Sequence, residues 1–282
     1  LAGHTGHHRL AVFARRPAPL QVTWLGYGAT TGLDRIDYVL TDPVSTPPQD
    51  ESQFTERVWH LGLPRLPFSP PAEAPEPSVE APVDAAGVFT FGCFNNLAKL
   101  NPRVVGTWAR ILAAVPDSRL LLKSRHFDQP MARKSVVEGF ASFGVGAERV
   151  VLEGYDKRDR YFEAFSRVDI ALDPFPFTGG MSTLDALWMG VPVLSKRGDR
   201  MIGRQGEMVA QHLGLDDWLA DDEDAYVALA VRKAADRAAL AALRRTLRPR
   251  MQAAAFAQPG AYAKALAEAL WGMWRDKAGA AG

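Results

Sequence analysis

The chain has 282 residues, of which 47% are hydrophobic and 23% charged, and its formal net charge at pH 7 is +1. This composition is typical of a globular protein with a sizeable core and excludes a disordered chain, while the near-neutral charge gives no indication of nucleic-acid or membrane binding. The single cysteine excludes an internal disulfide framework and favours a cytoplasmic location. No apolar run approaches the roughly 20 residues that span a bilayer.

Residues 1–62 predict short strands joined by loops. The stretches 20–27 and 35–42 are rich in β-forming residues and each predicts a strand, whereas 50–61 predicts a short helix followed by a strand. The chain does not start with Met, and its first ten residues carry no helix or strand signal. We therefore expect a fragment or a processed chain.

Residues 63–86 predict a linker between two lobes. Seven of the 20 prolines fall between residues 61 and 85. Proline at this density forbids helix interiors and central strands, so we expect a semi-rigid, extended connection and a domain boundary.

From residue 87 onward, strands and helices alternate. Short apolar runs predict strands at 88–94, 118–124, 149–155, 169–175 and 191–195. Helical spacing of apolar residues predicts helices at 102–115, 131–144, 158–168, 182–190 and 206–215. This alternation predicts βαβ units, so residues 87–245 are expected to form an α/β lobe with a doubly wound, Rossmann-like parallel sheet. Cys93 falls in the first of these strands and is expected to be a small buried hydrophobic residue.

The tail, residues 246–282, is predicted to be helical. Trp271 and Trp274 lie three apart in the last helix and are expected to dock it on the body of the protein. Four arginines upstream are expected to form a solvated face rather than a nucleic-acid surface: Arg244, Arg245, Arg248 and Arg250.

The stretch FTGGMSTLDALW follows a predicted strand and opens a helix. The first N–H groups of a helix have no backbone acceptor, and the helix dipole favours an anion there, typically a phosphate. Gly179 and Gly180 let the backbone approach a ligand closely, and Ser182 and Thr183 add hydroxyl donors. Asp185 is expected in the first turn, where it can accept from a ribose hydroxyl. The alternative is structural, with Ser182 or Thr183 capping a buried helix.

Two other segments follow predicted strands. Asn95, Asn96 and Lys99 come after the strand at 88–94, where a lysine can meet a pyrophosphate and stabilise a departing nucleoside diphosphate. The alternative is a capping turn with a solvated lysine. The stretch GYDKRDRYF, residues 154–162, combines tyrosines with cations and suits a base and its sugar, although an ordinary charged loop has the same composition.

These three segments together predict a nucleotide-diphosphate site, because ligands of open parallel sheets bind outside the carboxyl ends of the strands. The chain has no G-x-G-x-x-G after its first strand and no G-x-x-x-x-G-K-[ST], so neither a dinucleotide fold nor a P-loop is indicated. His4, His7 and His8 are clustered without further ligands, and no metal and no cofactor are expected.

The chain resembles the catalytic region of the protein O-GlcNAc transferase and SPINDLY family of GT-B glycosyltransferases. The resemblance rests on FARRPAPLQVTWLGYGATTGLDRIDYVLTD, FGCFNNLAKLNP and DIALDPFPFTGGMSTLDALWMGVPVLS, together with the tail ending in LWGMW. It covers nearly the whole chain. It implies a GT-B fold in which residues 87–245 bind the donor and residues 1–62 are the last strands of a truncated, Rossmann-like acceptor-side lobe, an assignment that follows only from the resemblance.

The resemblance also implies roles for individual residues. Lys99 matches the lysine that contacts the donor diphosphate, Asn96 matches an Asn or Gln beside the same phosphates, and Asp185 matches a carboxylate that holds the ribose. Arg158 matches a basic residue near that ribose, and Tyr161 a ring that stacks on the base. The remaining nucleotide-sugar residues are then Asn95, Gly179, Gly180, Met181, Ser182 and Thr183. The sugar- or acceptor-facing residues are Thr5, Gly26, Tyr27, Gly28, Thr30 and Thr31.

Departures from the family pattern fall in the sugar pocket. O-GlcNAc transferases often carry His-Thr-Thr where this chain has Gly180, Met181 and Ser182, and often have Pro at the position of Gly28. The donor is expected to be UDP-GlcNAc, with GDP-fucose and UDP-glucose as alternatives.

The implied activity is an inverting, metal-independent transfer of a sugar to Ser or Thr hydroxyls of a protein or peptide acceptor. His4 is a candidate general base by position alone, and the family's acceptor-side histidines and tandem helical repeats are expected upstream in the full-length protein. The alternatives are a protein O-fucosyltransferase and a non-catalytic nucleotide-binding or scaffold module. Nucleic-acid and membrane partners are not expected.

Overall fold

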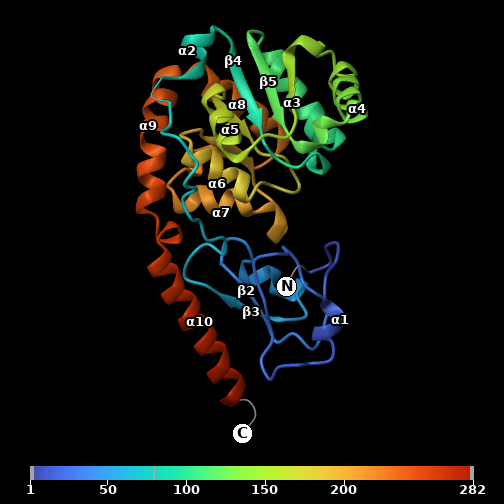
Figure 1. Cartoon of the computed structure of the whole chain (residues 1–282), viewed down its shortest axis with the longest axis vertical. Helices are drawn as coiled ribbons and strands as arrows, with labels where there is room; N and C mark the ends of the chain where they lie inside the picture. Colours follow the sequence, from blue (N-terminus) through green and yellow to red (C-terminus); the bar gives the residue numbers. More distant parts are fainter. Residues whose placement is uncertain (1–2, 79, 280–282) are drawn as a thin grey trace.

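The computed structural model describes residues 3–78 and 80–279, arranged in two tiers (Figure 1). The lower tier contains a three-stranded parallel sheet in the order β1-β2-β3. Its elements are α1 (Leu10–Phe13), β1 (Val22–Thr23), β2 (Tyr38–Thr41), the 3-10 helix η1 (Pro48–Gln53) and β3 (Arg57–His60). The strands expected at 20–27 and 35–42 are thus present but shorter than predicted.

The upper tier contains a six-stranded sheet in the order β6-β5-β4-β7-β8-β9, and all of its neighbouring strands are parallel. Its strands are β4 (Phe89–Cys93), β5 (Ser118–Lys123), β6 (Val150–Glu153), β7 (Ile170–Leu172), β8 (Val193–Lys196) and β9 (Leu219–Ala220). The strand order reverses direction between β4 and β7, so the sheet is doubly wound. This confirms the predicted Rossmann-like α/β class, with β9 as an additional short strand.

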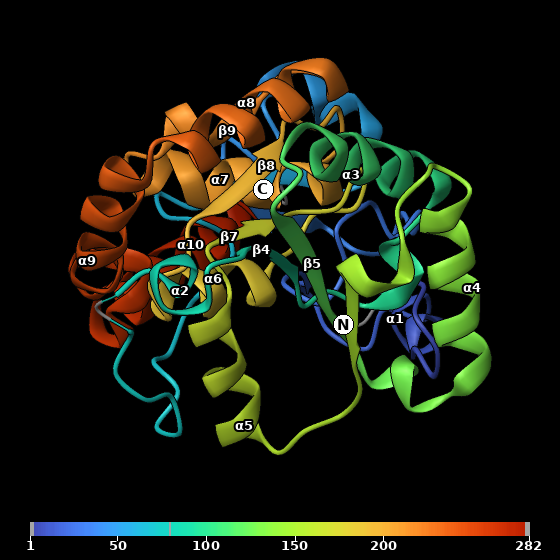
Figure 2. The same cartoon turned by 90° about the horizontal axis from the view of Figure 1, so that it is seen from above.

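Helices cover both faces of the six-stranded sheet (Figure 2). In chain order the helices after β3 are α2 (Pro82–Ala86), α3 (Pro102–Ala114), α4 (Pro130–Ala141), α5 (Arg158–Glu163), α6 (Met181–Trp188), α7 (Gln205–His212), α8 (Glu223–Ala235), α9 (Arg237–Ala253) and α10 (Pro259–Gly279), the last of which lies along the lower tier. Seen from above, α3 and α8 lie together on one side of the sheet, and α2, α5 and α6 lie on the other.

Helix α3 illustrates how local sequence specifies these elements. Asn101 caps it by accepting a hydrogen bond from the Val104 N–H at 3.1 Å, and Pro102 occupies the first helical position, where no N–H is needed. Trp108 and Ile111 then point into the core and are fully buried. Burial of such side chains is the main favourable term that holds a helix on a sheet.

The proline-rich segment connects the tiers and packs against both. It is largely extended, as predicted, but Phe68 is buried with its ring 5.5 Å from that of Trp188, centroid to centroid. The tail returns to the lower tier, where α10 runs along the small sheet (Figure 1). A Cβ on Gly272 would lie 2.5 Å from Trp59 Cζ2, so the helix and β3 are in close contact.

Three expectations for the tail are corrected. Trp271 and Trp274 are 65% and 45% exposed, because α10 packs through its opposite face, including Tyr262 and Met273. The arginine cluster is a solvated face only in part, because Arg244 and Arg248 are buried whereas Arg245 and Arg250 are exposed. The boundary expected between residues 245 and 246 falls inside the continuous helix α9.

Arg244 and Arg248 are buried because their guanidinium groups satisfy backbone carbonyls at helix and strand ends. Arg244 donates to the carbonyl of Val168 and Arg248 to that of Trp188, at 2.9 and 2.8 Å. Arg250 donates to the Leu213 carbonyl at 3.1 Å but is exposed, so Arg245 and Arg250 face solvent as expected.

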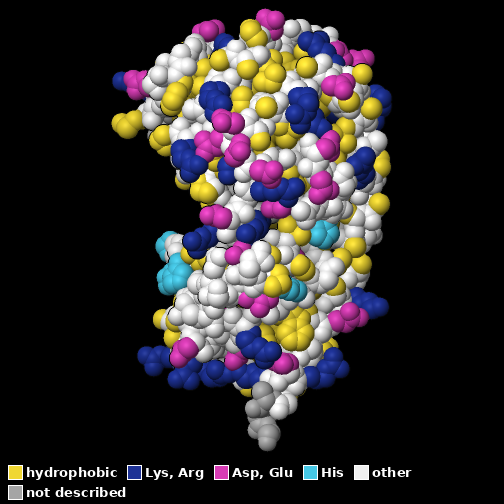
Figure 3. Space-filling model, turned by 180° about the vertical axis from the view of Figure 1, so that it is seen from behind, with side chains coloured by type: hydrophobic (Ala, Val, Ile, Leu, Met, Phe, Trp, Pro, Cys, Tyr) yellow, Lys and Arg dark blue, Asp and Glu magenta, His cyan; other side chains and the backbone are white. Residues whose placement is uncertain are grey.

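The surface on the reverse side has a hollow at mid-height between the two tiers (Figure 3). Lys and Arg side chains gather around the lower end of the molecule in the same view. Within the ranges 3–78 and 80–279, none of the helices combines the length and the apolar character needed to cross a membrane.

Candidate active site

The reversal of strand order between β4 and β7 places the ends of these strands side by side. Phe91 pairs with Ile170 and Gly92 with Ala171, so the chain leaves both strands at the same edge of the sheet. Asp173 follows directly after β7, and Asn95 lies two residues after the end of β4. This is the position at which doubly wound sheets bind ligands.

A polar cluster forms at this edge from Asn95, Lys99, Thr178 and Ser182. Lys99, at the end of the 3-10 helix η2 (Leu97–Lys99), donates from Nζ to Asn95 Oδ1 at 2.9 Å and to the Thr178 carbonyl at 2.8 Å. Ser182 Oγ donates to the same Asn95 Oδ1 at 2.9 Å. Two predicted segments that are about 80 residues apart in the chain are therefore in direct contact, as expected.

Lys99 is suited to meet an anion. Burial lowers the pKa of its ammonium, while the nearby carboxylate of Asp173 acts in the opposite direction. An ammonium has three N–H groups, and two of them are used in the hydrogen bonds to Asn95 and Thr178. Nζ also lies 4.0 Å from the centroid of the Phe177 ring, which limits its freedom. A ligand oxygen at this place would meet a fixed, partly desolvated cation.

Helix α6 begins beside this cluster without a side-chain cap. Thr183 and Leu184 donate their N–H groups to the Gly180 carbonyl, whereas those of Met181 and Ser182 reach no acceptor in the part of the chain that the structure describes. These two N–H groups and the helix dipole can accept an anion.

Asp173 shapes the turn that precedes α6, a role that the sequence analysis did not assign. Its carboxylate accepts from the Gly179 N–H at 2.6 Å and from Ser195 Oγ at 2.7 Å. Complete burial raises the pKa of Asp173 to about 6, although both hydrogen bonds act against this shift. Its place immediately after a buried strand was the signal that could have identified it.

Two details of this helix differ from expectation. Thr183 is only 3% exposed, and its hydroxyl has no hydrogen-bond partner among the described residues, so the hydroxyl lies under Gly179 rather than open to a ligand. Asp185 lies in the second turn of α6, not in the first. Met181, by contrast, is exposed at the helix start.

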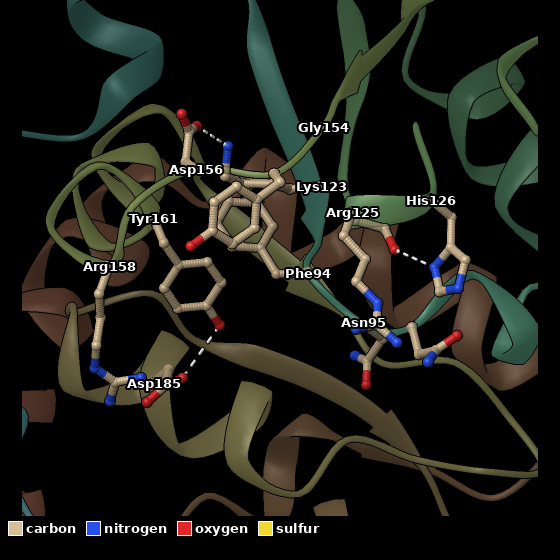
Figure 4. Close-up of a pocket in the computed structure, with 13 residues that line it drawn as sticks. Phe94, Asn95, Lys123, Arg125, His126, Gly154, Asp156, Arg158, Tyr161 and Asp185 are labelled. Atoms are coloured by element: carbon tan, nitrogen blue, oxygen red, sulfur yellow. Dashed lines mark hydrogen bonds and ion pairs between the residues drawn. The ribbon is translucent and has the colours of Figure 1, made fainter. Parts of the chain in front are cut away.

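A cavity of about 550 Å³ adjoins the polar cluster through Asn95. Its wall includes Asn96, Arg158, Tyr161 and Asp185, all of them predicted site residues. Figure 4 shows Arg158, Tyr161 and Asp185 together on one side of this cavity. Asn96 also caps η2 by accepting from the Ala98 N–H at 2.9 Å, so it has the capping role given as the alternative and lines the cavity as well.

Asp185 and Tyr161 are coupled at the cavity wall. The Tyr161 hydroxyl donates to Asp185 Oδ2 at 3.1 Å, and the Tyr161 ring packs against Phe94 with centroids 5.8 Å apart. Burial raises the pKa of Asp185 to about 6 against the effects of Tyr161 and Arg158. The carboxylate keeps a second oxygen with which it can accept from a ligand hydroxyl.

The raised pKa of Asp185 predicts an unusual dependence of stability on pH. Below about pH 4 this carboxyl is protonated in both states, and between pH 4 and 6 only the folded state holds the proton. Its contribution to the free energy of unfolding therefore falls as the pH rises through that window, by up to about 3 kcal/mol for a two-unit shift. Asparagine cannot ionise. The free energy of unfolding of Asp185→Asn should therefore rise by that amount relative to the parent chain between pH 4 and pH 7.

Urea unfolding at several pH values measures this difference. Asp199→Asn is the matched control because it removes the same charge from an exposed loop. A constant difference between Asp185→Asn and the parent across the window would contradict the burial of an ionised Asp185.

The far wall of the cavity comes from residues that the sequence analysis missed. Figure 4 places Arg125 and His126, which follow β5, opposite Tyr161. Lys123 is buried at the end of the same strand and forms ion pairs with Glu153 and Asp156. The stretch KSRHFD follows a predicted strand just as the chosen segments do, and this could have identified it.

Tyr155 is the most exposed aromatic residue of the cavity wall, at 71%. Its N–H donates to Asp128 Oδ1 at 3.1 Å, and a Cβ on Gly154 would lie 1.9 Å from the same oxygen. The loop after β6 therefore approaches Asp128 closely, and a larger residue at Gly154 would displace the Asp128 carboxylate. Asp156 fixes the other end of the loop through Lys123.

The predicted sugar- or acceptor-facing loop lies near the cluster but is only partly open. A Cβ on Gly28 would lie 3.3 Å from Ile202 Cβ, and the Ile202 carbonyl accepts from Thr178 Oγ1 at 3.2 Å. Thr30 and Thr31 both donate to the carboxylate of Glu56, and Thr31 is buried. The Thr31 hydroxyl therefore faces the protein interior, contrary to expectation.

His4 packs on the same loop. Its Nε2 lies 2.8 Å from the Thr31 carbonyl oxygen and its ring centroid 5.7 Å from that of Tyr27. A carbonyl oxygen can only accept, so Nε2 carries a proton and Nδ1 is the basic nitrogen of the neutral ring. Both segments form tight turns. The Thr5 carbonyl accepts from the His8 N–H, and the Trp24 carbonyl accepts from the Gly26 N–H.

The family of this chain is decided by a match to the glycosyl transferase family 41 model, which covers residues 1–64 and 80–266. The chain belongs to glycosyl transferase family 41. In this family 41 chain, the described residues include no group of three or more His, Cys, Asp and Glu side chains placed to hold a metal ion.

Related proteins agree with this assignment. The chain is 38% identical over 280 residues to the Petunia hybrida "Probable UDP-N-acetylglucosamine--peptide N-acetylglucosaminyltransferase SPINDLY", covering 98% of this chain and 30% of the relative. It is 28% identical over 288 residues to the Arabidopsis thaliana protein of the same activity name called SEC, covering 97% of this chain and 29% of that relative. The family 41 chain thus spans about 30% of the length of these curated relatives.

Solved structures confirm the fold. A mutant of Thermobaculum terrenum O-GlcNAc transferase superposes with a TM-score of 0.94 at 35% identity, covering all of this chain and 53% of that one. Sucrose-phosphate synthase from Thermosynechococcus elongatus superposes with a TM-score of 0.57 at 19% identity, covering 88% of this chain and 59% of that one. The family 41 resemblance and the GT-B fold expected from the sequence are both confirmed.

Proposed function

We propose that this chain is the donor-binding part of a protein O-glycosyltransferase that moves a sugar, most favourably GlcNAc from UDP-GlcNAc, onto Ser or Thr hydroxyls. The observation that carries the proposal is the polar cluster, in which Lys99, Asn95 and Ser182 meet at the free start of α6. The names of the SPINDLY and SEC relatives support the donor and the peptide acceptor.

In this proposal the cluster stabilises the leaving group. The acceptor hydroxyl oxygen forms a bond to the anomeric carbon from the face opposite the diphosphate, and the bond between that carbon and the phosphate oxygen breaks. The electron pair departs with the diphosphate, whose growing charge meets the Lys99 ammonium and the N–H groups of Met181 and Ser182. The acceptor proton passes to a base, for which Nδ1 of His4 is the candidate in this chain. No metal is required for these steps.

The adjoining cavity is proposed to hold the nucleoside. The second oxygen of Asp185 would accept from a ribose hydroxyl, with Tyr161 and Arg158 beside it. Asn95 joins this cavity to the cluster, so a nucleoside in the cavity would direct its diphosphate toward Lys99. The protein or peptide acceptor would approach from the side of the Gly28 loop.

A thermal-shift panel with UDP, GDP, UDP-GlcNAc, UDP-glucose and GDP-fucose tests this proposal. UDP at about 100 times its dissociation constant should add about 2.7 kcal/mol to the stability of the folded state, because it binds only that state. For a chain of this size the midpoint should rise by about 5 °C or more.

The panel also distinguishes the alternatives. A larger increase in the unfolding midpoint with GDP and GDP-fucose than with the uridine ligands would indicate that the donor is GDP-fucose. UDP binding without transfer or donor hydrolysis would favour a non-catalytic binding module. Absence of any shift with all five ligands would overturn the proposed site.

A further inference from the structure

Arg65 is a buried guanidinium at the junction of the two tiers. It follows β3, and only 2% of the residue is exposed. Nη2 donates to Gln205 Oε1 at 3.0 Å, whereas Nε and Nη1 have no hydrogen-bond partner among residues 3–78 and 80–279. Burying a charged group with unsatisfied N–H groups is costly, so its retention calls for a reason.

The backbone of Arg65 is held by the lower tier and the tail. Its N–H donates to Asp42 Oδ2 at 3.0 Å, next to β2, and its carbonyl accepts from Trp24 Nε1 and from the Tyr262 hydroxyl, both at 3.0 Å. Burial lowers the pKa of Arg65, and the carboxylate of Asp42 opposes that shift. The side chain therefore extends toward the upper tier from a fixed base.

Gln205 receives that side chain and passes the contact to the polar cluster. It is the first residue of α7, and its Nε2 donates to the Thr178 carbonyl at 3.2 Å. The same carbonyl accepts from Lys99 Nζ at 2.8 Å. The hydrogen bonds thus run without interruption from Arg65 through Gln205 and the Thr178 carbonyl to Lys99.

Gln205 and Leu66 lie against the turn that opens α6. A Cβ on Gly180 would lie 3.1 Å from Gln205 Oε1 and 3.2 Å from Cδ1 of Leu66, the neighbour of Arg65. The Gly179–Gly180 turn therefore rests on Gln205 and Leu66, and the Gln205 Oε1 that faces it accepts from the positively charged guanidinium of Arg65. In a low-dielectric surrounding, a charge at such a place attracts an anion more strongly than it would at the surface.

We infer that Arg65 is a positioning residue for the donor diphosphate: through Gln205 it fixes the Thr178 carbonyl and the Gly179–Gly180 turn, and it supplies a buried positive charge behind them. This inference rests on the proposed function. Arg65 would then connect the two tiers, because its backbone is anchored in the lower, acceptor-side tier and its side chain acts on the donor phosphates bound by the upper tier.

The test compares UDP with uridine, which lacks the diphosphate. Arg65→Met should reduce UDP affinity at least about tenfold in calorimetry and leave uridine affinity, measured by ligand-observed NMR, unchanged. Arg65→Lys keeps the charge but cannot reach Gln205 in the same geometry, and should fall between the parent and Arg65→Met. Gln205→Met should reproduce the selective loss and carries the test if Arg65→Met does not fold.

Arg244→Met is a matched control. Arg244 is also buried and has two guanidinium nitrogens without partners among the described residues, but it donates to the Val168 and Asp169 carbonyls at the other end of the sheet. The Arg244→Met variant should have a changed free energy of unfolding but the same ratio of UDP to uridine affinity as the parent chain. Equal effects of Arg65→Met and Arg244→Met on this ratio would overturn the inference.

The outcome for the unmodified chain separates this inference from the proposed function. A parent chain that binds UDP no more tightly than uridine has no diphosphate site, and both proposals then fail. A parent chain that prefers UDP, together with Arg65→Met and Gln205→Met variants that keep the full preference, leaves the proposed function standing and removes only the role of Arg65.

Discussion

Lys99→Ala is expected to lower the affinity of the chain for UDP by about ten- to a hundredfold with little loss of thermal stability. A hydrogen bond to a charged partner is worth about 1.5–3 kcal/mol, which corresponds to this range of affinities. Stability should change little because both acceptors of the lost Lys99 hydrogen bonds keep another donor. Ser182 still donates to Asn95 Oδ1, and Gln205 still donates to the Thr178 carbonyl. The cost of burying the ammonium, seen in its lowered pKa, also disappears.

The effect of Lys99→Ala on sugar transfer should exceed its effect on binding. Charge on the leaving diphosphate grows in the transition state, and removal of one fixed donor to such a charge typically costs about 10²- to 10³-fold in rate. Lys134→Ala is the control, because Lys134 is exposed on α4, where it pairs with Glu138 at 3.7 Å. Unchanged transfer and UDP binding in Lys99→Ala would remove Lys99 from the mechanism.

The sequence was sufficient to predict the sheet and one end of the site, because both depend on local patterns. Buried strands such as β4 are continuous apolar runs, and each is followed by polar residues at the carboxyl end. In a parallel sheet these ends share one edge, so Asn95, Lys99 and Ser182 could be brought together before any contact was known. The family resemblance strengthened this prediction without being needed for it.

The sequence was not sufficient where tertiary packing decides which side of an element is buried. Helix α10 has apolar residues on more than one side, and β3 packs on the side of Met273 rather than that of Trp271. Arg244 and Arg248 look like surface charges in the sequence, yet they satisfy carbonyls at element ends that lie far away in the chain. Such contacts leave no periodic signal.

Arg65 and Gln205 could not be predicted for a similar reason. Arg65 lies in the proline-rich segment that the sequence predicts to be a linker. Gln205 lies at the start of α7, where the sequence contains no recognisable motif. Their importance lies in one hydrogen bond between segments about 140 residues apart. Lys123 differs, because it follows the same strand-end rule as Asn95 and was only overlooked.

Gly179→Ala is expected to abolish preferential UDP binding and to destabilise the chain. The added Cβ would lie 2.4 Å from Thr183 Oγ1, 2.8 Å from Ser182 Oγ and 2.9 Å from Asp173 Oδ1. Thr183 and Asp173 are buried and cannot move aside cheaply, so the turn itself must shift and weaken the bond from the Gly179 N–H to Asp173. Overpacking of this kind costs about 1–3 kcal/mol, and the misplaced donors at the start of α6 should lower UDP affinity at least about a hundredfold.

Two variants separate the clash from a general effect of replacing glycine. Gly62→Ala is the control, since no atom lies within 4 Å of its added Cβ, and it should leave the unfolding midpoint and UDP binding unchanged. Combining Gly179→Ala with Thr183→Ala removes the nearest clashing atom, a hydroxyl that has no partner among the described residues, and should recover part of the stability. Recovery of UDP affinity should be smaller, because the contacts with Ser182 and Asp173 persist. If Gly179→Ala binds UDP as the parent does, the diphosphate is not held at this turn, and the start of α6 has only a structural role.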